Sequence, residues 1–243
     1  MLIAEHITTG YGKKQVLTDV SFEVKQREIV LLIGSNGSGK TTLLKTIYGL
    51  LKTWPVSAEA PAGKNNGKIY FSGEDITGLP AHRLLKKGLL YIPQKNNCFE
   101  DLSVQANLEM AGLIIPDSSL LKQRIKNAYI IFPMLKALAK RTPMKMSGGE
   151  RQHLAMAMAM LHQPKMILMD EPVIGLDHRA MQIVFDSIKK LNNLGVTFLI
   201  VEHRVRETYQ IANRIISLKF GAVFSIEEVN DNFNINKLNT VFI

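Results

Sequence analysis

The sequence predicts an α/β protein whose core is a mainly parallel β-sheet. Three observations support this: strands alternate with helices late in the chain, a glycine-rich turn joins an early apolar strand to a helix, and a helical block interrupts the alternation. The 243 residues suffice for one domain, 1–243, and 46% apolar against 21% charged residues is typical of a globular protein with a substantial core.

Hydrophobic periodicity places the individual elements. Short apolar or alternating runs predict strands at 2–8, 16–24, 28–33, 67–72, 89–92, 166–169, 196–201 and 214–218. Helical spacing predicts helices at 40–50, 80–87, 147–161, 179–194 and 203–212. The block 103–145 is mostly helical in pattern, with breaks at Pro116, Pro133 and Pro143, which indicates an inserted lobe of roughly 95–160. Residues 52–66 are rich in Pro, Gly and Asn and predict a surface loop.

Composition narrows the class of protein. Thirty basic and 21 acidic side chains give a net charge of +9, which suits an anionic partner such as a nucleotide, a lipid headgroup or a nucleic acid. Cys98 is the single cysteine, so no internal disulfide forms and a reducing compartment is expected. No apolar run reaches the roughly 18–20 residues of a membrane helix, and no signal peptide is recognisable, so a cytoplasmic protein is expected.

A phosphate-binding pattern follows the strand at 28–33. Its glycines let backbone N–H groups curl around phosphates, the lysine reaches the β and γ phosphates, and the hydroxyl after it ligates Mg²⁺. The helix that starts here adds the positive end of its dipole. The alternative is a flexible glycine loop, which the strand–loop–helix context disfavours. The predicted nucleotide-binding residues are Gly34, Ser35, Asn36, Gly37, Ser38, Gly39, Lys40, Thr41 and Thr42.

A second candidate is the apolar strand 166–169, which ends in two carboxylates. Asp170 fits the Mg²⁺-ligand role of such a strand end in enzymes with this phosphate loop. Glu171, one residue later, is placed to orient or deprotonate an attacking water. A solvated strand end is the commoner interpretation of Asp-Glu alone, but the phosphate loop upstream favours the catalytic one.

The third candidate is Met146-Ser147-Gly148-Gly149-Glu150-Arg151-Gln152, called here the signature stretch. A serine N-cap with two glycines forms an anion site at a helix start. With the other motifs, this stretch resembles the signature of the nucleotide-binding subunits of ATP-binding cassette (ABC) transporters. The resemblance covers nearly the whole chain. It implies a P-loop ATPase fold with an N-terminal antiparallel β subdomain, ATP and Mg²⁺ as cofactors, and roles for Ser147, Gly148 and Gly149 in nucleotide binding.

Four further residues take roles only through this resemblance. It implies that Tyr11 stacks on adenine, that Gln94 contacts Mg²⁺ and the catalytic centre together with Thr41 and Asp170, that Asp177 belongs to the D-loop, and that His203 senses the γ-phosphate. Taken singly, each is more often a surface aromatic, a turn amide, a loop acid or a cap. Two positions depart from the family: Met146 replaces leucine, and Met158 replaces a common arginine.

The branch of the family is read from short stretches. Residues 75–83, 91–94, 102–104, 107–108 and 132–135 resemble ATPases of branched-chain (hydrophobic) amino-acid importers. His203-x-Val205-Arg206-Glu207-Thr208 is closer to the ATPase of lipopolysaccharide export, and urea-importer ATPases are also similar. A soluble ABC protein acting on nucleic acid is disfavoured, because the chain has one cassette and no heptad run.

The resemblance also implies partners. They are transmembrane permease subunits, a second ATPase (a copy or a paralogue) and a periplasmic or extracellular binding protein, with no nucleic acid. The expected location is peripheral, on the inner face of the cell membrane. Residues 118–145 hold seven basic and no acidic side chains, which favours either an anionic membrane surface or simply a solvated face.

Overall fold

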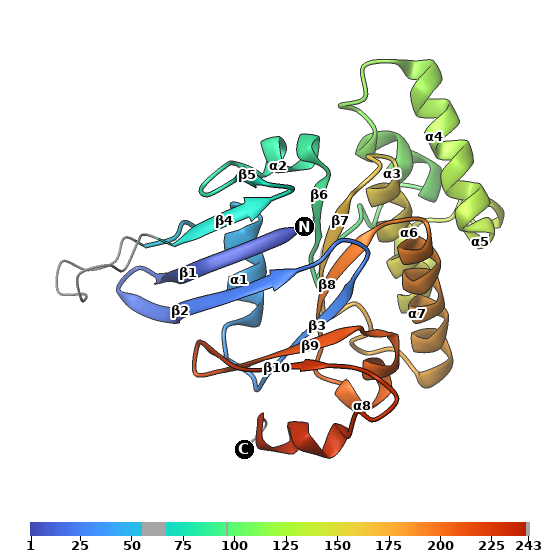
Figure 1. Ribbon diagram of the computed structural model, residues 1–243. Helices are drawn as coiled ribbons and strands as arrows, with labels where there is room; N and C mark the ends of the chain where they lie inside the picture. Colours follow the sequence, from blue (N-terminus) through green and yellow to red (C-terminus); the bar gives the residue numbers. More distant parts are fainter. Residues whose placement is uncertain (55–66, 96, 242–243) are drawn as a thin grey trace.

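The computed structural model describes residues 1–54, 67–95 and 97–241, and its elements form two sheets with helices around them (Figure 1). The larger sheet has the order β10-β9-β3-β8-β7-β6, and all neighbours in it are parallel except the hairpin β9–β10. Its strands are β3 (Ile29–Ile33), β6 (Leu89–Ile92), β7 (Met166–Asp170), β8 (Thr197–Val201), β9 (Arg214–Lys219) and β10 (Ala222–Glu228). The predicted mainly parallel core is confirmed.

The smaller sheet is antiparallel and has the order β2-β1-β4-β5. It contains β1 (Leu2–Tyr11), β2 (Lys14–Val24), β4 (Lys68–Phe71) and β5 (Glu74–Asp75). Three register shifts interrupt the pairing of β1 with β2, so the alternation of apolar side chains is imperfect along both strands. The part of the loop 52–66 that lies at 55–66, expected to be a surface insertion, is outside the described residues.

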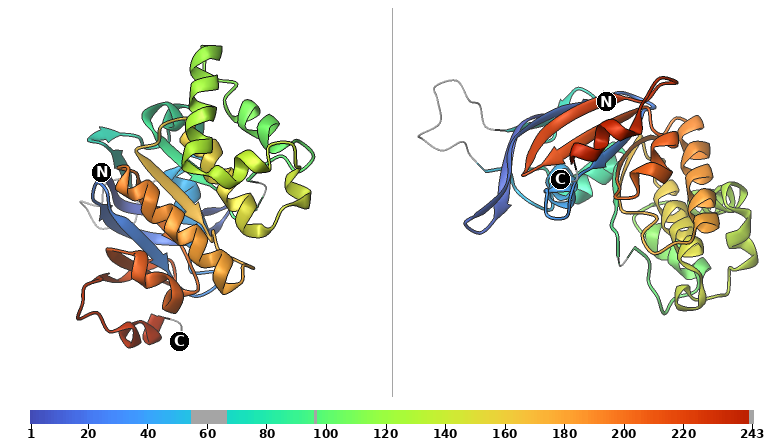
Figure 2. Two further views of the ribbon diagram at one scale, coloured as in Figure 1. Left: turned by 90° about the vertical axis from the view of Figure 1, so that its right-hand side faces the viewer. Right: turned by 90° about the horizontal axis from the view of Figure 1, so that it is seen from below.

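Helices surround the larger sheet. They are α1 (Lys40–Ile47), α2 (Ala81–Lys87), α3 (Val104–Ala111), α4 (Ser118–Ile131), α5 (Pro133–Ala137), α6 (Gly148–Met160), α7 (His178–Asn193) and α8 (Val205–Thr208), with 3₁₀ turns η1 (Pro143–Lys145), η2 (Tyr209–Ile211) and η3 (Ile235–Val241). The helices α3 to α6 lie between β6 and β7 in the chain, and they stand at the opposite end of the molecule from the antiparallel sheet (Figure 2). No described helix combines the length and the apolar composition that crossing a bilayer requires.

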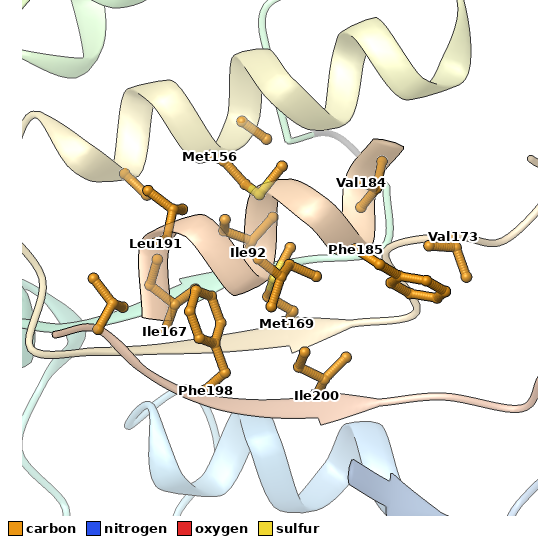
Figure 3. Packing of buried hydrophobic residues seen from close by; sticks show 14 of the residues in the cluster. Ile92, Met156, Ile167, Met169, Val173, Val184, Phe185, Leu191, Phe198 and Ile200 are labelled. Atoms are coloured by element: carbon orange, nitrogen blue, oxygen red, sulfur yellow. The ribbon is translucent and has the colours of Figure 1, made fainter. Parts of the chain in front are cut away.

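Alternate residues of the larger sheet enter two different cores. Val30 and Leu32 pack on α1, which is enclosed between the two sheets, whereas Leu31 and Ile33 face α6 and α7. Figure 3 shows the second core, where Phe198 and neighbouring strand side chains meet those of α6 and α7. Burial on both faces explains why these strands are continuous apolar runs in the sequence.

Two sequence predictions differ from the structure. The helix predicted at 203–212 is only α8 followed by η2, because the chain turns into β9 at Arg214. The Thr208 hydroxyl donates to the Arg204 carbonyl (2.9 Å), a bond that often bends helices. The strand β10 was not predicted. A register shift between Val223 and Ser225 interrupts the alternation of apolar and polar side chains. The sequence of β10 therefore lacks the regular alternation that predicts a strand.

Candidate nucleotide-binding and hydrolysis site

The glycine-rich loop connects the buried strand β3 to α1. Gly37 and Gly39 have φ of 80° and 102°, in the left-handed region that glycine adopts without strain. Lys40 is only 5% exposed, and its ammonium donates to the carbonyls of Gly34 and Ser35, at 2.9 Å each. Burial lowers the pKa of Lys40, although the nearby carboxylates of Glu171 and Asp170 act in the opposite direction. The carbonyls of the loop therefore surround the Lys40 ammonium.

This loop borders a surface cavity of about 570 Å³, called here the nucleotide cavity. The volume falls within the range of ordinary small-molecule sites. Within residues 1–54, 67–95 and 97–241, the buried Ser38 hydroxyl of the loop has no hydrogen-bond partner. The cavity is lined by Tyr11, Lys14, Gln15, Val16, Asn36, Gly37, Gly39, Lys40, Thr41, Thr42, Glu171, His203, Phe220 and Gly221. Its positive loop and hydroxyl groups fit a polyphosphate.

Asp170 connects the end of β7 to the start of α1. Its carboxylate accepts from the Thr41 hydroxyl (3.0 Å) and from the Tyr91 hydroxyl (3.2 Å), and it is only 4% exposed. Burial raises the pKa of Asp170, while these two hydrogen bonds lower it. A buried hydroxyl–carboxylate pair supplies the oxygen donors that Mg²⁺ prefers.

The Glu171 carboxylate lies between two side chains, those of Gln94 and His203. Its Oε2 accepts from Gln94 Nε2 (2.6 Å), and its Oε1 lies 2.7 Å from His203 Nε2. Glu171 has φ of 49°, which is uncommon for a residue other than glycine and is stabilised by the hydrogen bond from its N–H to the Val201 carbonyl (3.0 Å). Backbone strain of this kind concentrates at functional sites.

A second carboxylate, that of Glu202, is buried next to His203. Glu202 is 2% exposed and accepts from the backbone N–H groups of Val173 (3.4 Å) and His203 (3.3 Å). Burial raises the pKa of Glu202 to about 7, and the Glu171 charge adds to the increase. The group therefore titrates close to neutral pH.

Tyr11 ends β1 at the rim of the nucleotide cavity, with 49% of its surface exposed. Phe220 lines the same cavity from the tip of the β9–β10 hairpin. The cavity therefore has polar walls at the glycine-rich loop and aromatic side chains elsewhere on its border.

The signature stretch forms the capped start of α6. Ser147 Oγ accepts from the Glu150 N–H (3.2 Å), and Glu150 Oε2 accepts from the Ser147 N–H (2.7 Å), which is a complete capping box. Gly148 lies against Leu176, where an added Cβ would come within 2.5 Å of the leucine Cδ2. Asp177 caps α7, because its Oδ1 accepts from the backbone N–H of Ala180 (2.9 Å).

The structure places the sequence-predicted residues at the nucleotide cavity, at a second hollow or outside both. Most of the loop, together with Tyr11, Glu171 and His203, borders the nucleotide cavity. Gln94 and Gly148 line a separate hollow of about 260 Å³, and Ser147 and Asp177 line neither. Gln94 connects the second hollow to the nucleotide cavity through its hydrogen bond to Glu171. At the position of the expected arginine, Met158 packs partly buried against the core.

Sequence reasoning missed three residues of this region. Tyr91 lies on β6, three residues before Gln94. Its hydroxyl on an otherwise apolar strand was the signal for a hydrogen bond. Glu202 directly precedes His203 and directly follows β8, as Glu171 directly follows β7. Phe220 had no local signal, because only the hairpin brings it to the cavity.

Comparison with known proteins agrees with this geometry. A family model described as ABC transporter matches residues 17–174. LivF of Archaeoglobus fulgidus, a probable branched-chain amino acid transport ATP-binding protein, is 38% identical over 92% of this chain and 90% of its own. BraG of Pseudomonas aeruginosa, a high-affinity branched-chain amino acid transport ATP-binding protein, is 37% identical over 92% and 91%.

Two further matches extend the comparison. The lipopolysaccharide export system ATP-binding protein LptB of Haemophilus influenzae is 32% identical over 100% of this chain and 97% of its own. Among solved structures, the ADP conformation of MJ1267, an ATP-binding cassette of an ABC transporter, has a TM-score of 0.86 and 26% identity over 99% and 96% of the two chains. These matches confirm the resemblance read from the signature stretch. The chain belongs to the ABC transporter family, as an ATP-binding subunit that hydrolyses ATP.

Proposed function

We propose that this subunit powers the import of branched-chain or other hydrophobic amino acids, with Glu171 as the catalytic base. The observation that carries the catalytic part is the Glu171 carboxylate, held between Gln94 and His203 on the border of the cavity that Lys40 lines. A carboxylate fixed at both oxygens, next to a phosphate-binding loop, is placed to accept the proton of a water attacking the γ-phosphate.

The remaining roles follow from the same geometry. Lys40, which now donates to two loop carbonyls, would donate to phosphate oxygens instead. Thr41 and Asp170 would hold Mg²⁺, and Gln94 would offer its amide oxygen. When bound, Mg²⁺ neutralises charge that develops on the phosphates. His203 holds Glu171 in position and lines the cavity, where it contacts the terminal phosphate.

The signature stretch acts on a nucleotide held by a second chain. Two observations support this: Ser147 lies outside the nucleotide cavity, and its hydroxyl and the Glu150 carboxylate are directed to the start of their own helix. A helix N-terminus of this kind attracts an anion that the same chain does not supply. Pairing with a second copy or with a paralogous ATPase completes each site.

The location that we propose for the subunit is the inner face of the membrane, on permease subunits. The basic surface of α4 and α5 supports this location, since Lys122, Lys126 and Lys136 are exposed around the apolar Ile130. Arg124 from the same block has a structural part instead, because its Nη1 donates to the Leu161 carbonyl (2.7 Å) at the end of α6.

The substrate class is carried by the two branched-chain relatives at 38% and 37% identity. The second candidate, lipopolysaccharide export, is favoured by the full-length match to LptB at 32%. The test is to purify the tagged chain from its native membranes, identify the permeases bound to it, and measure leucine uptake in cells that carry either the wild-type chain or Glu171→Gln. Loss of leucine uptake in the variant supports the proposal. Unchanged leucine uptake together with defective lipopolysaccharide transport refutes it.

A further inference from the structure

Phe220 combines two unfavourable features at one position. Its side chain is 87% exposed, which is the largest exposure among the large hydrophobic residues described, and its φ is 50°. A bulky side chain in the left-handed region is strained, and turns of this kind normally use Gly, Asn or Asp. Exposure to water and the left-handed backbone both disfavour phenylalanine at this position. A function of the aromatic ring would explain why it is present.

The ring borders the nucleotide cavity. Phe220 lines this cavity together with Tyr11 and Val16, while the glycine-rich loop lines it elsewhere. Tyr11 comes from the end of β1 and Phe220 from the turn between β9 and β10, so two aromatic side chains from different sheets border one cavity.

The hairpin that carries the ring is fixed on both sides. Gly221 approaches β2 so closely that a Cβ would lie 2.1 Å from the Val16 carbonyl oxygen, and its own carbonyl accepts from the Thr18 N–H (2.8 Å). At the other side, a Cβ on Gly34 would lie 2.3 Å from the Leu218 carbonyl oxygen. Backbone contacts with β2 and with the first glycine of the phosphate loop therefore hold the turn at the cavity.

Contacts within the hairpin do not account for the ring. The Lys219 ammonium lies 5.8 Å from the Phe220 ring centre and 5.5 Å from that of Phe224, so the lysine interacts with both rings and leaves Phe220 exposed. Phe224 shares this cation and the hairpin but does not line the cavity, which makes it a natural control.

We propose that Phe220 is a second aromatic contact for the adenine of ATP, so that the base packs against both Tyr11 and Phe220. The proposal rests on the proposed function, which places ATP in this cavity. An aromatic face suits a purine, because stacking contacts between bases and aromatic side chains are strong and need no exact hydrogen-bond pattern. The strained turn is then the cost of presenting a ring at this position.

The test separates the base end of the ligand from the phosphate end. Dissociation constants for ATP and for inorganic tripolyphosphate are measured by calorimetry, with melting temperatures, for wild type, Phe220→Asn, Phe220→Tyr and Phe224→Asn. We expect Phe220→Asn to weaken ATP binding about fivefold or more and to leave tripolyphosphate binding unchanged. The same variant should melt at a higher temperature, because asparagine tolerates the left-handed turn.

The control variants complete the test. Phe220→Tyr keeps the ring and should bind ATP within about twofold of wild type, and Phe224→Asn should match wild type for both ligands. Equal ATP affinity in Phe220→Asn and wild type, with Tyr11→Ala weakened, overturns the role of Phe220 and leaves the proposed function intact. A wild-type chain that binds neither ATP nor tripolyphosphate overturns both.

Discussion

The nucleotide cavity and the start of α6 differ in where their functional groups find partners. At the cavity, side chains from distant segments already bond to one another, as in Thr41 with Asp170 and Gln94 with Glu171. At the start of α6, the two reciprocal hydrogen bonds between Ser147 and Glu150 lie within one helical turn. The first region brings together side chains from distant segments of the sequence. The second is a capped helix end, and we propose that its anion is a nucleotide held by a second chain.

The largest expected effect tests the first region. Glu171→Gln removes the proton acceptor while keeping side-chain size, so ATP hydrolysis should slow by ~10²-fold or more and ATP binding should persist. Phosphate release and ATP affinity are measured on the purified variant. Glu228→Gln, which changes an exposed carboxylate on β10, is the matched control and should hydrolyse ATP normally. Wild-type turnover in Glu171→Gln removes this residue from the mechanism.

The next prediction tests whether the two regions belong to different chains. Lys40→Ala removes the phosphate-binding ammonium, and Ser147→Arg places a bulky side chain at the helix end, so each variant alone should be inactive. A random mixture of pairing chains should recover about a quarter of wild-type hydrolysis, because half of the dimers are mixed and each has one intact site.

Both chains must first be shown to pair, by gel filtration with ATP in a Glu171→Gln background. If the chain pairs with a paralogue instead, the two substitutions are divided between the two proteins. A mixture of pairing chains that is no more active than its components shows that the site is complete within one chain.

A third prediction concerns the buried acid behind the cavity. The pKa of Glu202 is raised to about 7 from an ordinary value of 4.5. The folded chain therefore keeps a proton that the unfolded chain loses above pH 4.5, so the free energy of unfolding falls as pH rises from 4.5 to 7. The slope from this group is up to about 1.4 kcal/mol per pH unit, or tenfold in the unfolding equilibrium.

Glu202→Gln removes this titration. Urea denaturation of both proteins at pH 5, 6 and 7 should show a steeper loss of stability in the wild type than in the variant. If the free energy of unfolding changes equally with pH in the two proteins, Glu202 is charged in the folded state throughout this range.

The smallest expected effect lies at the rim of the cavity. Tyr11→Ala should weaken ATP binding by roughly 1 kcal/mol, which is about fivefold, and Tyr11→Phe should be nearly silent. The fold should survive both changes, because half of the side chain is already exposed. Fluorescence titration with ATP measures the affinities, and circular dichroism checks the fold. Equal affinities for wild type and Tyr11→Ala return Tyr11 to an ordinary surface residue.

Local spacing was enough to predict much of this molecule. The fold class followed from strand–helix alternation and was confirmed, and the loop from Gly34 to Thr41 stands between a strand and a helix as expected. Ser147 was expected to cap a helix, and it does so with Glu150 as its capping-box partner. These features depend on residues close in sequence, where periodicity and capping preferences act.

Contacts between distant segments were beyond sequence reasoning. Tyr91 reaches Asp170 across 79 positions, and this pairing depends on β6 lying next to β7 in the sheet. The placement of Phe220 depends on β10, a strand whose register shift hides its pattern. The roles assigned to Tyr11, Gln94, Asp177 and His203 remain predictions, although the structure brings Gln94 and His203 to the same carboxylate.

The position of α1 determines how a bound ligand should change the stability of the rest of the protein. The helix begins at the phosphate loop, and its Leu43, Leu44 and Ile47 belong to the core enclosed between the two sheets. Opening the loop therefore requires disturbing that core, so amide hydrogens of α1 should be among the slowest to exchange. Ligand at 100 times its dissociation constant adds about 2.7 kcal/mol to the free energy of unfolding, which makes thermal-shift screening a direct way to find what the loop binds.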